Sequence, residues 1–346
     1  MSELPSGQTI EAVRPNLDGE RADRVLGFWS EHGVLEGEKA RERLKDVVCL
    51  LLGEGGEILG VNSVYDEALP LVGGRRFWVY RSYLLPDASS ADAAMINAAF
   101  DALEQEFGSN RLGPIGLCVP STAAEQGRRG RDLVLPETQL MYAGYLDEGR
   151  EARIRYFDDA PIGPGLPNSP TLADTASLSK YPLEDRYRIE PLADSEAVGP
   201  DDVLALWARE NAVAEADRGR RVHEVILAAI DRDDSLAGIS SAYLQRNDQL
   251  RMDLWYYRTY VAKPHRHSNI ATQMLWASRD YLKNRFDSGE DTRAAGVIFE
   301  LQNQGLKDYF NRALWLPANF TFIGENDRGD HVRVHYFPGA EAPALS

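Results

Sequence analysis

The stretch from Val261 to Thr272 combines residue types that can bind a negatively charged group. An aromatic and β-branched run up to Val261 predicts a strand, and apolar residues recur at helical spacing from Ile270 onward. A basic and polar turn containing Arg266 lies between them. The first N–H groups of a helix have no partner in the helix and lie at the positive end of its dipole. This order predicts a phosphate or pyrophosphate site, with an ordinary strand-to-helix connection and a solvated turn as the alternative.

The spacing in this stretch resembles the acyl-CoA loop of the GCN5-related N-acetyltransferase (GNAT) superfamily. In that family an Arg or Gln, two residues, Gly, one residue and Gly or Ala follow a strand that ends in Val. Here Arg266 and Ala271 match, and Asn269 replaces the first Gly. Asn is one of the few residues besides Gly that tolerate a left-handed backbone. The resemblance implies acetyl-CoA as co-substrate, held by this loop: Val261, Arg266, His267, Ser268, Asn269, Ile270, Ala271 and Thr272.

A second segment, Glu300 to Phe310, is similar to another motif of the same family. In that motif an Asn at a helix start contacts the pantetheine arm, and a Tyr about two turns later protonates the departing thiolate. The resemblance gives these roles to Asn303 and Tyr309, although the commoner spacing would select Phe310. Packing of both aromatic residues in a core is the alternative. The Tyr309 hydroxyl would have to reach a cleft where the strand ending at Val261 splays from the strand ending at Glu300.

Acetylation of an amine requires a base that deprotonates the nucleophile. Glu300, at the end of a predicted strand beside the expected acyl position, is our candidate, and Asp253 is the second. His223, His265 and His267 are further candidates, but two of them flank the loop and suit ligand contacts better. No metal site is expected, because the His265 and His267 pair lacks partners at metal-ligand spacing.

The elements that carry these residues occur twice along the chain. The segment 25–29 matches 203–207, and at nearly the same offset 78–83 matches 255–260. Several separated matches in register predict a tandem duplication. A segment rich in Pro and Gly lies between the copies and predicts a semi-rigid linker. We therefore expect a first domain at 1–158, a linker at 159–185 and a second domain at 186–346.

The sequence of each copy predicts the same order of elements. A short strand comes first, followed by a helical region, a run of antiparallel strands, a loop and helix, a buried strand, another helix and a closing hairpin. This mixed α/β (α+β) order is that of the acyl-CoA N-acyltransferase fold, so the resemblance implies two tandem copies of it, each a mostly antiparallel mixed sheet flanked by helices. Trp29 and Trp207 are predicted core residues. Arg81 and Arg258 repeat on a strand, and we expect a carboxylate to pair with each.

The two copies differ in the loop. Arg266 aligns with Ser89 and Asn269 aligns with Asp92, so the first copy lacks the cation and gains an anion. A carboxylate that faces a pyrophosphate lowers affinity through like-charge repulsion. The first copy therefore resembles the degenerate half of a tandem acetyltransferase, and we expect one acetyl-CoA site per chain, in the second copy.

The composition favours a soluble globular protein. Of the 346 residues, 43% are hydrophobic, and the formal net charge of −16 makes nucleic acid a poor partner. No apolar run is long enough to cross a bilayer, and the first residues lack signal-peptide character, which predicts a cytoplasmic protein without a membrane partner. Cys49 and Cys118 lie in apolar runs and are predicted buried thiols rather than a disulfide or metal pair.

These observations predict an N-acetyltransferase that transfers acetyl from acetyl-CoA to an amine of a small molecule or peptide. The second copy would catalyse direct transfer in a ternary complex, without an acyl-enzyme. A ligand-binding or scaffolding protein that retains the fold and has lost turnover is the alternative. Neither the acceptor nor the oligomeric state has a motif in the chain.

Overall fold

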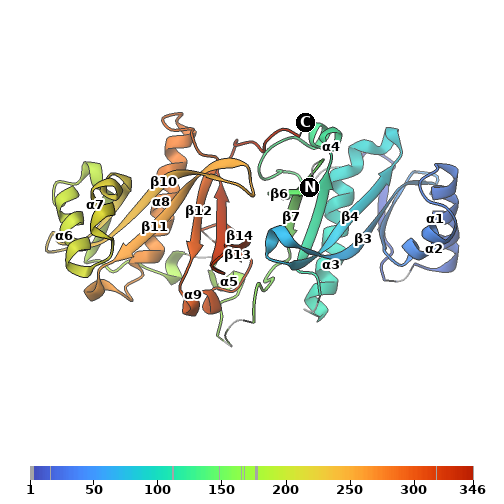
Figure 1. Ribbon diagram of the computed structural model, residues 1–346. Coiled ribbons are helices and arrows are strands. Elements are labelled where there is room, and N and C mark those ends of the chain that lie inside the picture. The colour runs from blue at the N-terminus through green and yellow to red at the C-terminus, as the bar shows by residue number, and fades with distance from the viewer. Residues whose placement is uncertain are drawn as a thin grey trace. The chain divides into compact units, whose positions relative to one another are not determined.

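The computed structural model describes residues 4–15, 17–110, 113–147, 149–164, 166, 168–175, 178–316 and 318–345. Parts of two predictions lie outside these residues: positions 1–3 at the start of the chain, and positions 165, 167, 176 and 177 of the expected linker. The chain divides into two compact units, Met1–Ala160 with Ala342–Ser346, and Pro161–Glu341. Figure 1 shows one sheet with flanking helices in each unit.

The first unit holds one sheet of seven strands. Its elements are β1 (Thr9–Ala12), α1 (Gly19–Glu31), α2 (Gly37–Leu44), β2 (Val47–Leu52), β3 (Ile58–Leu69), β4 (Arg75–Leu84), α3 (Asp92–Asn110), β5 (Gly116–Ser121), α4 (Ala123–Arg129), β6 (Met141–Asp147) and β7 (Arg150–Tyr156). The strand order is β1-β2-β3-β4-β5-β7-β6. β4 and β5 are parallel neighbours, and the remaining pairs are antiparallel.

The second unit repeats this order and adds one strand at an edge. Its elements are α5 (Leu172–Thr175), β8 (Tyr187–Pro191), α6 (Pro200–Glu210), α7 (Glu215–Arg221), β9 (Val225–Asp231), β10 (Leu236–Asn247), β11 (Met252–Val261), α8 (Ile270–Asp287), β12 (Gly296–Leu301), α9 (Gln304–Tyr309), β13 (Leu314–Trp315), β14 (Phe320–Glu325) and β15 (His331–Tyr336). The strand order is β13-β14-β15-β12-β11-β10-β9-β8. Read from β8, and leaving out the added strand β13, it is the same as the order in the first unit. The two sheets therefore share one topology, as the sequence repeat predicts.

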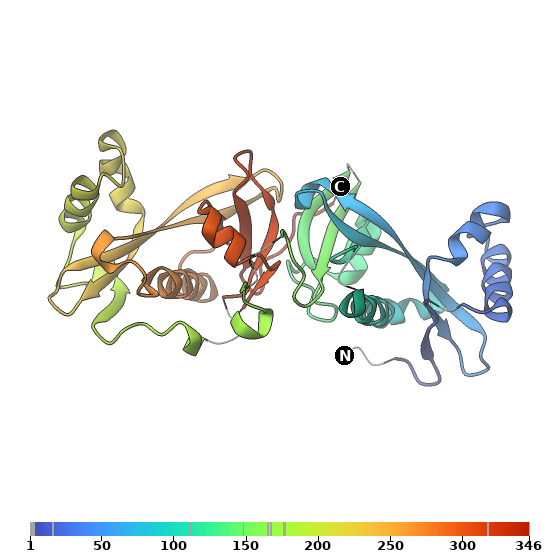
Figure 2. The ribbon, with the colours of Figure 1, turned by 90° about the horizontal axis from the view of Figure 1, so that it is seen from below.

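Helices cover both faces of the second sheet. In β9, Leu227 and Ala229 pack in a cluster with residues of α8, whereas Ala228 and Ile230 pack in a cluster with residues of α6. Because successive side chains of a strand point to opposite faces, α8 and α6 must lie on opposite sides of the sheet. Figure 2 shows this arrangement, with the two short helices α6 and α7 on one side and α8 on the other.

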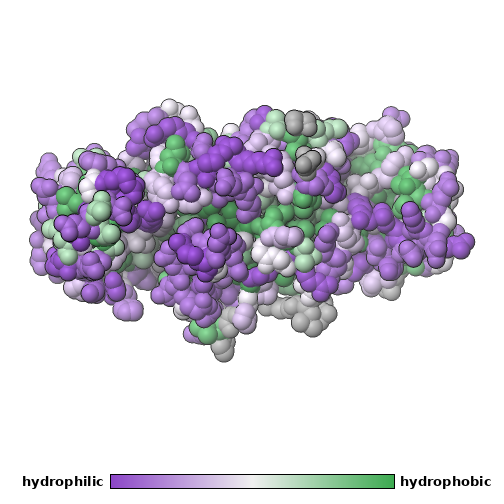
Figure 3. Space-filling view, viewed as in Figure 1, coloured by the Kyte–Doolittle hydropathy of each residue, from purple (hydrophilic) through white to green (hydrophobic). Residues whose placement is uncertain are grey.

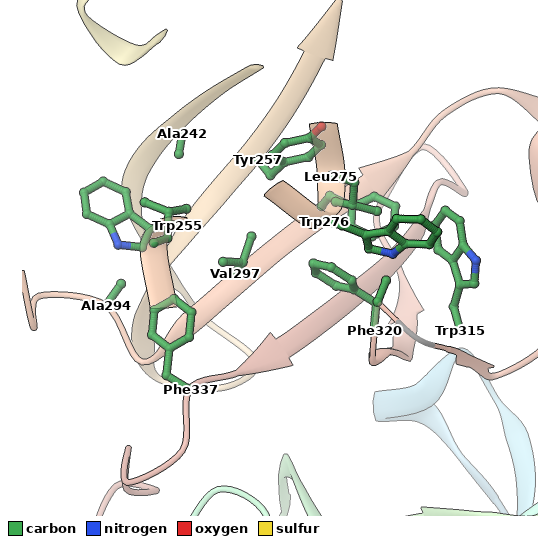
Figure 4. Packing of buried hydrophobic residues seen from close by; sticks show 13 residues of the cluster. Ala242, Trp255, Tyr257, Leu275, Trp276, Ala294, Val297, Trp315, Phe320 and Phe337 are labelled. Carbon is green, nitrogen blue, oxygen red and sulfur yellow. The ribbon is translucent and has the colours of Figure 1, made fainter. Parts of the chain in front are cut away.

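A large aromatic cluster fills the space between α8 and the centre of the second sheet. Leu275 and Trp276 from α8 pack with Trp255 and Tyr257 from β11 and with Phe320 from β14. Figure 4 shows Tyr257 beside Leu275, away from Ala294 and Phe337. This cluster fixes α8 against the sheet, and burying each large apolar side chain stabilises the fold by roughly 1.5 to 3 kcal/mol.

The predicted fold class is confirmed: both units are mixed α/β, with mostly antiparallel sheets flanked by helices. The core positions Trp29 and Trp207 are 3% and 1% exposed. Both cysteines are free and buried, and burial raises the pKa of each thiol to about 12, so they are poor nucleophiles at neutral pH. Among the described residues, no helix has both the length and the hydropathy needed to cross a membrane.

The ends of the second unit differ from the predicted boundaries. Residues 161–185, expected as a linker, group with the second unit, where the Ile162 N–H donates to the Asn311 carbonyl over 2.8 Å. Residues from Ala342 onward group with the first unit, where the Ala342 N–H donates to the Arg131 carbonyl over 2.7 Å. The chain thus leaves the first unit after Ala160 and returns to it at Ala342.

Candidate active site

A gap between β11 and β12 forms the centre of the candidate site. These parallel strands pair at two described register positions, Trp255 with Val297 and Tyr256 with Ile298. Beyond these positions the strands diverge, while β11 remains paired with β10 as far as Val261 and β12 remains paired with β15 as far as Leu301. The divergence is the splay that the sequence predicts, and it lies at the carboxyl ends of both strands.

A cleft of about 930 Å³ occupies this splay. Its walls include the first turn of α8 with Ala271 and Thr272, the end of β12 with Glu300, and α9 with Asn303 at its start. Aromatic and aliphatic side chains form its floor, and Figure 3 shows hydrophobic side chains over β12 among largely hydrophilic surroundings. Polar and charged side chains also line the cleft, and a concave site that combines apolar surface with placed polar groups is typical of small-molecule binding.

The start of α8 has backbone donors that no side chain caps. The N-cap residue Asn269 has a left-handed backbone, with φ 58° and ψ 1°, as its alignment with the family Gly predicts. Its side-chain amide donates instead to the Pro182 carbonyl over 3.1 Å. The first helical bond runs from the Gln273 N–H to the Asn269 carbonyl, so the N–H groups of residues 270–272 precede it. An uncapped helix start offers unpaired N–H donors at the positive end of the helix dipole, and such a start can bind an anion.

The loop before α8 is held by its own contacts. The Arg266 Nε donates to the Val261 carbonyl over 3.3 Å, and the exposed guanidinium lies 5.8 Å from the centre of the Tyr260 ring. His267 also has a positive φ, of 68°, which the sequence did not predict. Ser268 is buried and donates to the His265 carbonyl. Arg266 and His267 are therefore exposed on this loop, whereas Ser268 shapes it.

The predicted bases lie in different places. Glu300 lines the cleft, and its carboxylate accepts a hydrogen bond of 2.7 Å from Arg328. Asp253 lies at the start of β11, where Arg246 is 3.9 Å away, and it lines a different depression on the surface. The His265 Nδ1 lies 3.0 Å from the Tyr187 hydroxyl, so this ring supports the loop. Of these candidates, Glu300 alone combines a carboxylate with a position in the described part of the cleft.

Helix α9 starts at the predicted Asn303, but a residue other than the predicted Tyr309 lines the cleft. The Asn303 side chain caps the helix by accepting from the Leu306 N–H over 3.0 Å. Tyr309 is half-buried at the helix end, with its ring centre 4.8 Å from that of Phe310. Among the described residues that line the cleft, α9 and its C-cap contribute Leu306 and Phe310, not Tyr309. The commoner family spacing selects that same position, Phe310.

Several residues that line the cleft were not predicted as site residues from the sequence. They are Arg221, Tyr243, Gln245, Tyr256, Tyr257, Arg258 and the turn residues Asn326, Asp327 and Arg328. Tyr256, Arg258 and Tyr260 alternate along β11, so the period of a strand was the available signal for them. The turn between β14 and β15 reaches the cleft through strand pairing, and no local pattern indicates it.

The repeated strand arginines have different partners in the two units. Arg258 lies 3.5 Å from the Glu224 carboxylate, which confirms the expected pairing. The guanidinium carbon of Arg81 lies 3.8 Å from the centre of the Tyr65 ring, so its principal described contact is an aromatic face. Arg258 has the same kind of contact with Tyr243, at 4.0 Å.

The first unit has an ion pair where the second has the uncapped helix start. Asp92 begins α3, and its carboxylate accepts two hydrogen bonds from Arg129 of α4, of 2.7 and 3.1 Å. The Arg129 guanidinium also donates to the Ser121 hydroxyl over 2.9 Å. Both members of the ion pair are largely buried. An internal carboxylate and its partner thus occupy the helix start in this unit.

No protein-family model and no curated protein matches the chain. Solved structures match it over parts of its length. An acetyltransferase of the GNAT family from Streptococcus pneumoniae is 12% identical, with a TM-score of 0.32, over 44% of this chain and 99% of its own. A GNAT family acetyltransferase from Brucella melitensis, in complex with acetyl-CoA, is 13% identical, with a TM-score of 0.30, over 47% of this chain and 95% of its own.

Arabidopsis thaliana NAA60, in complex with a bisubstrate analogue, is 13% identical with a TM-score of 0.31, over 44% of this chain and 99% of its own. Each of these matches covers nearly all of the other protein and less than half of this chain. Likeness at this level establishes no shared activity. The case for a function depends on the residues of the cleft.

Proposed function

We propose that the second unit binds acetyl-CoA and transfers its acetyl group to an amine. The observation that carries this proposal is the uncapped start of α8 at the edge of a cleft between two diverging strands. A long thioester ligand with a pyrophosphate needs both features, an anion site and a cleft next to it. The resemblance of the loop from Val261 to Thr272 to the GNAT acyl-CoA loop supports the same ligand.

The N–H groups of residues 270–272 would hold the pyrophosphate, and the exposed Arg266 and His267 would lie beside it. The pantetheine arm would pass into the splay, where Asn303 and Phe310 line the wall. Asn303 uses its side-chain oxygen as a helix cap, which leaves its amide N–H groups for a ligand carbonyl.

The proposed chemistry is direct transfer. Glu300 accepts a proton from the acceptor ammonium, directly or through water, and the amine nitrogen attacks the thioester carbonyl carbon. A C–N bond forms, the C–S bond breaks and the nitrogen loses its remaining extra proton to water, so the products are an N-acetylated amine and a thiolate. The resemblance to the family motif gives the role of proton donor to Tyr309, although among the described residues Phe310, and not Tyr309, lines the cleft. The Arg328 side chain donates a hydrogen bond of 2.7 Å to the Glu300 carboxylate and orients it at the cleft wall.

A second candidate function is binding of acyl-CoA without turnover. Two observations favour it: Arg328 already occupies one Glu300 oxygen, and Phe310 lines the cleft where a proton donor is expected. Both candidates require the CoA site, so binding is the first property to measure.

The test uses the natural difference between the two units. Isothermal titration of the full chain with acetyl-CoA should give one site per chain. Asn269→Asp introduces the residue that the first unit has at this position and should weaken binding by about tenfold, because a carboxylate would face the pyrophosphate. Asn269→Gly is the matched control, since Gly also adopts a positive φ, and it should bind as the unaltered chain does.

Two equal sites per chain would contradict the assignment to the second unit. Equal affinities of the Asp and Gly variants would show that the start of α8 does not contact the anionic part of the ligand.

A further inference from the structure

Two arginine side chains line the cleft on the side of α6 and α7. Arg258 comes from β11, and its guanidinium carbon lies 4.0 Å from the centre of the Tyr243 ring. Arg221 comes from the end of α7 and lies 5.9 Å from the Trp207 ring. An aromatic face lies next to each group and restricts its motion in part.

One carboxylate serves these guanidinium groups. Glu224 lies 3.5 Å from Arg258, 4.0 Å from Arg221 and 2.5 Å from Arg220. Arg220 has a further partner in Asp217, at 3.6 Å, on the exposed side of the helix. Burial, and after it the nearby charge of Arg258, lower the pKa of Arg221. This side of the cleft therefore has excess positive charge, in a chain whose net charge is −16.

The opposite wall of the cleft carries Glu300 and Asp327, with Arg328 bound to the Glu300 carboxylate. Tyr256 pairs with Ile298, so Arg258 and Glu300 each lie two residues further along strands that diverge. Side chains two residues apart on a strand share a face, so Arg258 and Glu300 face the cleft from its two walls. A ligand with an amine at one end and an anion at the other would be complementary to both walls.

We infer that the acceptor in the proposed reaction carries an anionic group, a carboxylate or a phosphate, in addition to its amine, and that Arg221 and Arg258 bind this group. The inference rests on the proposed function for the identity of the reacting amine. Arginine forms paired hydrogen bonds with either anion, and the planar guanidinium groups here are already held in place. Glu300 would then face the amine.

The first unit provides a control in the same molecule. Arg43 and Arg81 align with Arg221 and Arg258 in the repeat, and Arg81 lies over the Tyr65 ring as Arg258 lies over Tyr243. The charge of Arg81 lowers the pKa of Arg43 after the larger effect of burial. Because the inference concerns the second unit, substitutions of Arg43 and Arg81 should leave acceptor binding unchanged.

The experiment measures binding to the full chain with pairs of amines that differ in one anionic group. Lysine with cadaverine tests the carboxylate, and phosphoethanolamine with ethanolamine tests the phosphate. Calorimetric titrations are made with and without saturating CoA, and thiol release from acetyl-CoA reports transfer. We expect one anionic member to bind more tightly than its neutral partner, and the pair in which this occurs identifies the anion.

Arg258→Gln and Arg221→Gln should each weaken binding of that anionic member by about tenfold to a hundredfold, the loss of a hydrogen bond to a charged group. Arg258→Lys should restore part of it, which separates lost charge from misfolding. In these variants the affinity for the neutral amine and for CoA should not change. In the control variants Arg81→Gln and Arg43→Gln, the affinities for all of these ligands should equal those of the unaltered chain.

Three results would overturn the inference: neutral amines that bind as well as anionic ones, no binding of any anionic probe at millimolar concentration, or an equal loss of CoA affinity in Arg258→Gln. The last result would mean that the arginines bind the phosphates of CoA. Failure of the unaltered chain to bind acetyl-CoA would instead count against the proposed function, while the titrations without CoA would still decide the anion site.

Discussion

The side chains in the second unit's cleft differ in how firmly each is held before a ligand arrives. Burial raises the pKa of Tyr257, so its hydroxyl remains protonated at neutral pH and can only donate or accept a hydrogen bond. Burial raises the pKa of Tyr256 as well, and its hydroxyl accepts from the Asn247 amide over 3.0 Å. Arg266, in contrast, is exposed on the surface. The tyrosines of the cleft are thus held before a ligand binds, while the anion loop keeps exposed side chains.

Tyr309→Phe tests the proposed proton donor. If Tyr309 protonates the thiolate, loss of its hydroxyl should reduce turnover by about 10² to 10⁴-fold and leave CoA affinity nearly unchanged. The measurement is steady-state thiol release with an acceptor found as above. Retained turnover would leave Tyr309 with a packing role against Phe310, and Tyr257→Phe would then test the tyrosine that lines the cleft.

A buried histidine should make the second unit sensitive to acid. His335 of β15 has its Nδ1 3.0 Å from the Asn319 carbonyl, and burial lowers its pKa from 6.5 to about 4. The unfolded chain therefore takes up the proton first as pH falls. Stability is complete above about pH 6.5 and decreases toward pH 4, by up to about 3 kcal/mol from this group. Urea unfolding followed across this range measures the effect.

His335→Gln provides the comparison, because it removes the titrating group from the same site. Its stability should depend less on pH across this range, whatever its stability at pH 7. An unchanged pH dependence would show that other groups cause the acid sensitivity.

At the scale of elements, patterns that depend on neighbours in sequence were predictable. The apolar run around Cys49 lies in β2, and the helical spacing after Ile270 is α8. The strand β9, Val225–Asp231, was not predicted, because its Ala pair favours a helix in isolation. Between β8 and β10, with helices on both faces, small residues fit a strand instead.

The same distinction holds for the candidate site. The loop at 261–272 and the helix start at Asn303 were found because each is a short contiguous motif. Arg221, Tyr243 and Arg328 come from three separate elements, and sheet formation alone brings them to one cleft. The spacing of residues in the sequence does not indicate which side chains from separate elements lie in one cleft. Their burial and charges in the folded chain do.

At the scale of the whole molecule, the C-terminal segment is part of the first unit. The Arg131 side chain donates to the Ala342 carbonyl, with a shortest distance of 2.7 Å, and the Gln126 side chain donates to the Pro343 carbonyl over 3.0 Å. The Leu345 N–H donates in turn to the Gln126 side-chain oxygen over 3.0 Å. These bonds satisfy polar groups of α4 and of the segment that follows it.

Removal of residues 342–346 should therefore loosen the first unit near α4. Hydrogen exchange of peptides that span 123–131 should become faster, because Gln126 and Arg131 lose partners that are costly to leave unmade. Peptides from α8 should exchange as before. Gln126→Ala, which keeps the tail but removes two of its bonds, should produce part of the same change; equal exchange in all three proteins would show that the tail contributes nothing to stability.

The return of the chain to its first unit also has an entropic consequence. Docking of the tail closes a loop made of the entire second unit, and the cost of closing a loop increases with the length of chain that remains disordered. When the second unit is folded, most of that loop is already compact, and the closure costs less. When it unfolds, the cost rises by roughly 2 kcal/mol for three doublings of free length at about 0.6 kcal/mol each. Unfolding of one unit would thus weaken the other through chain connectivity alone, without any shared surface.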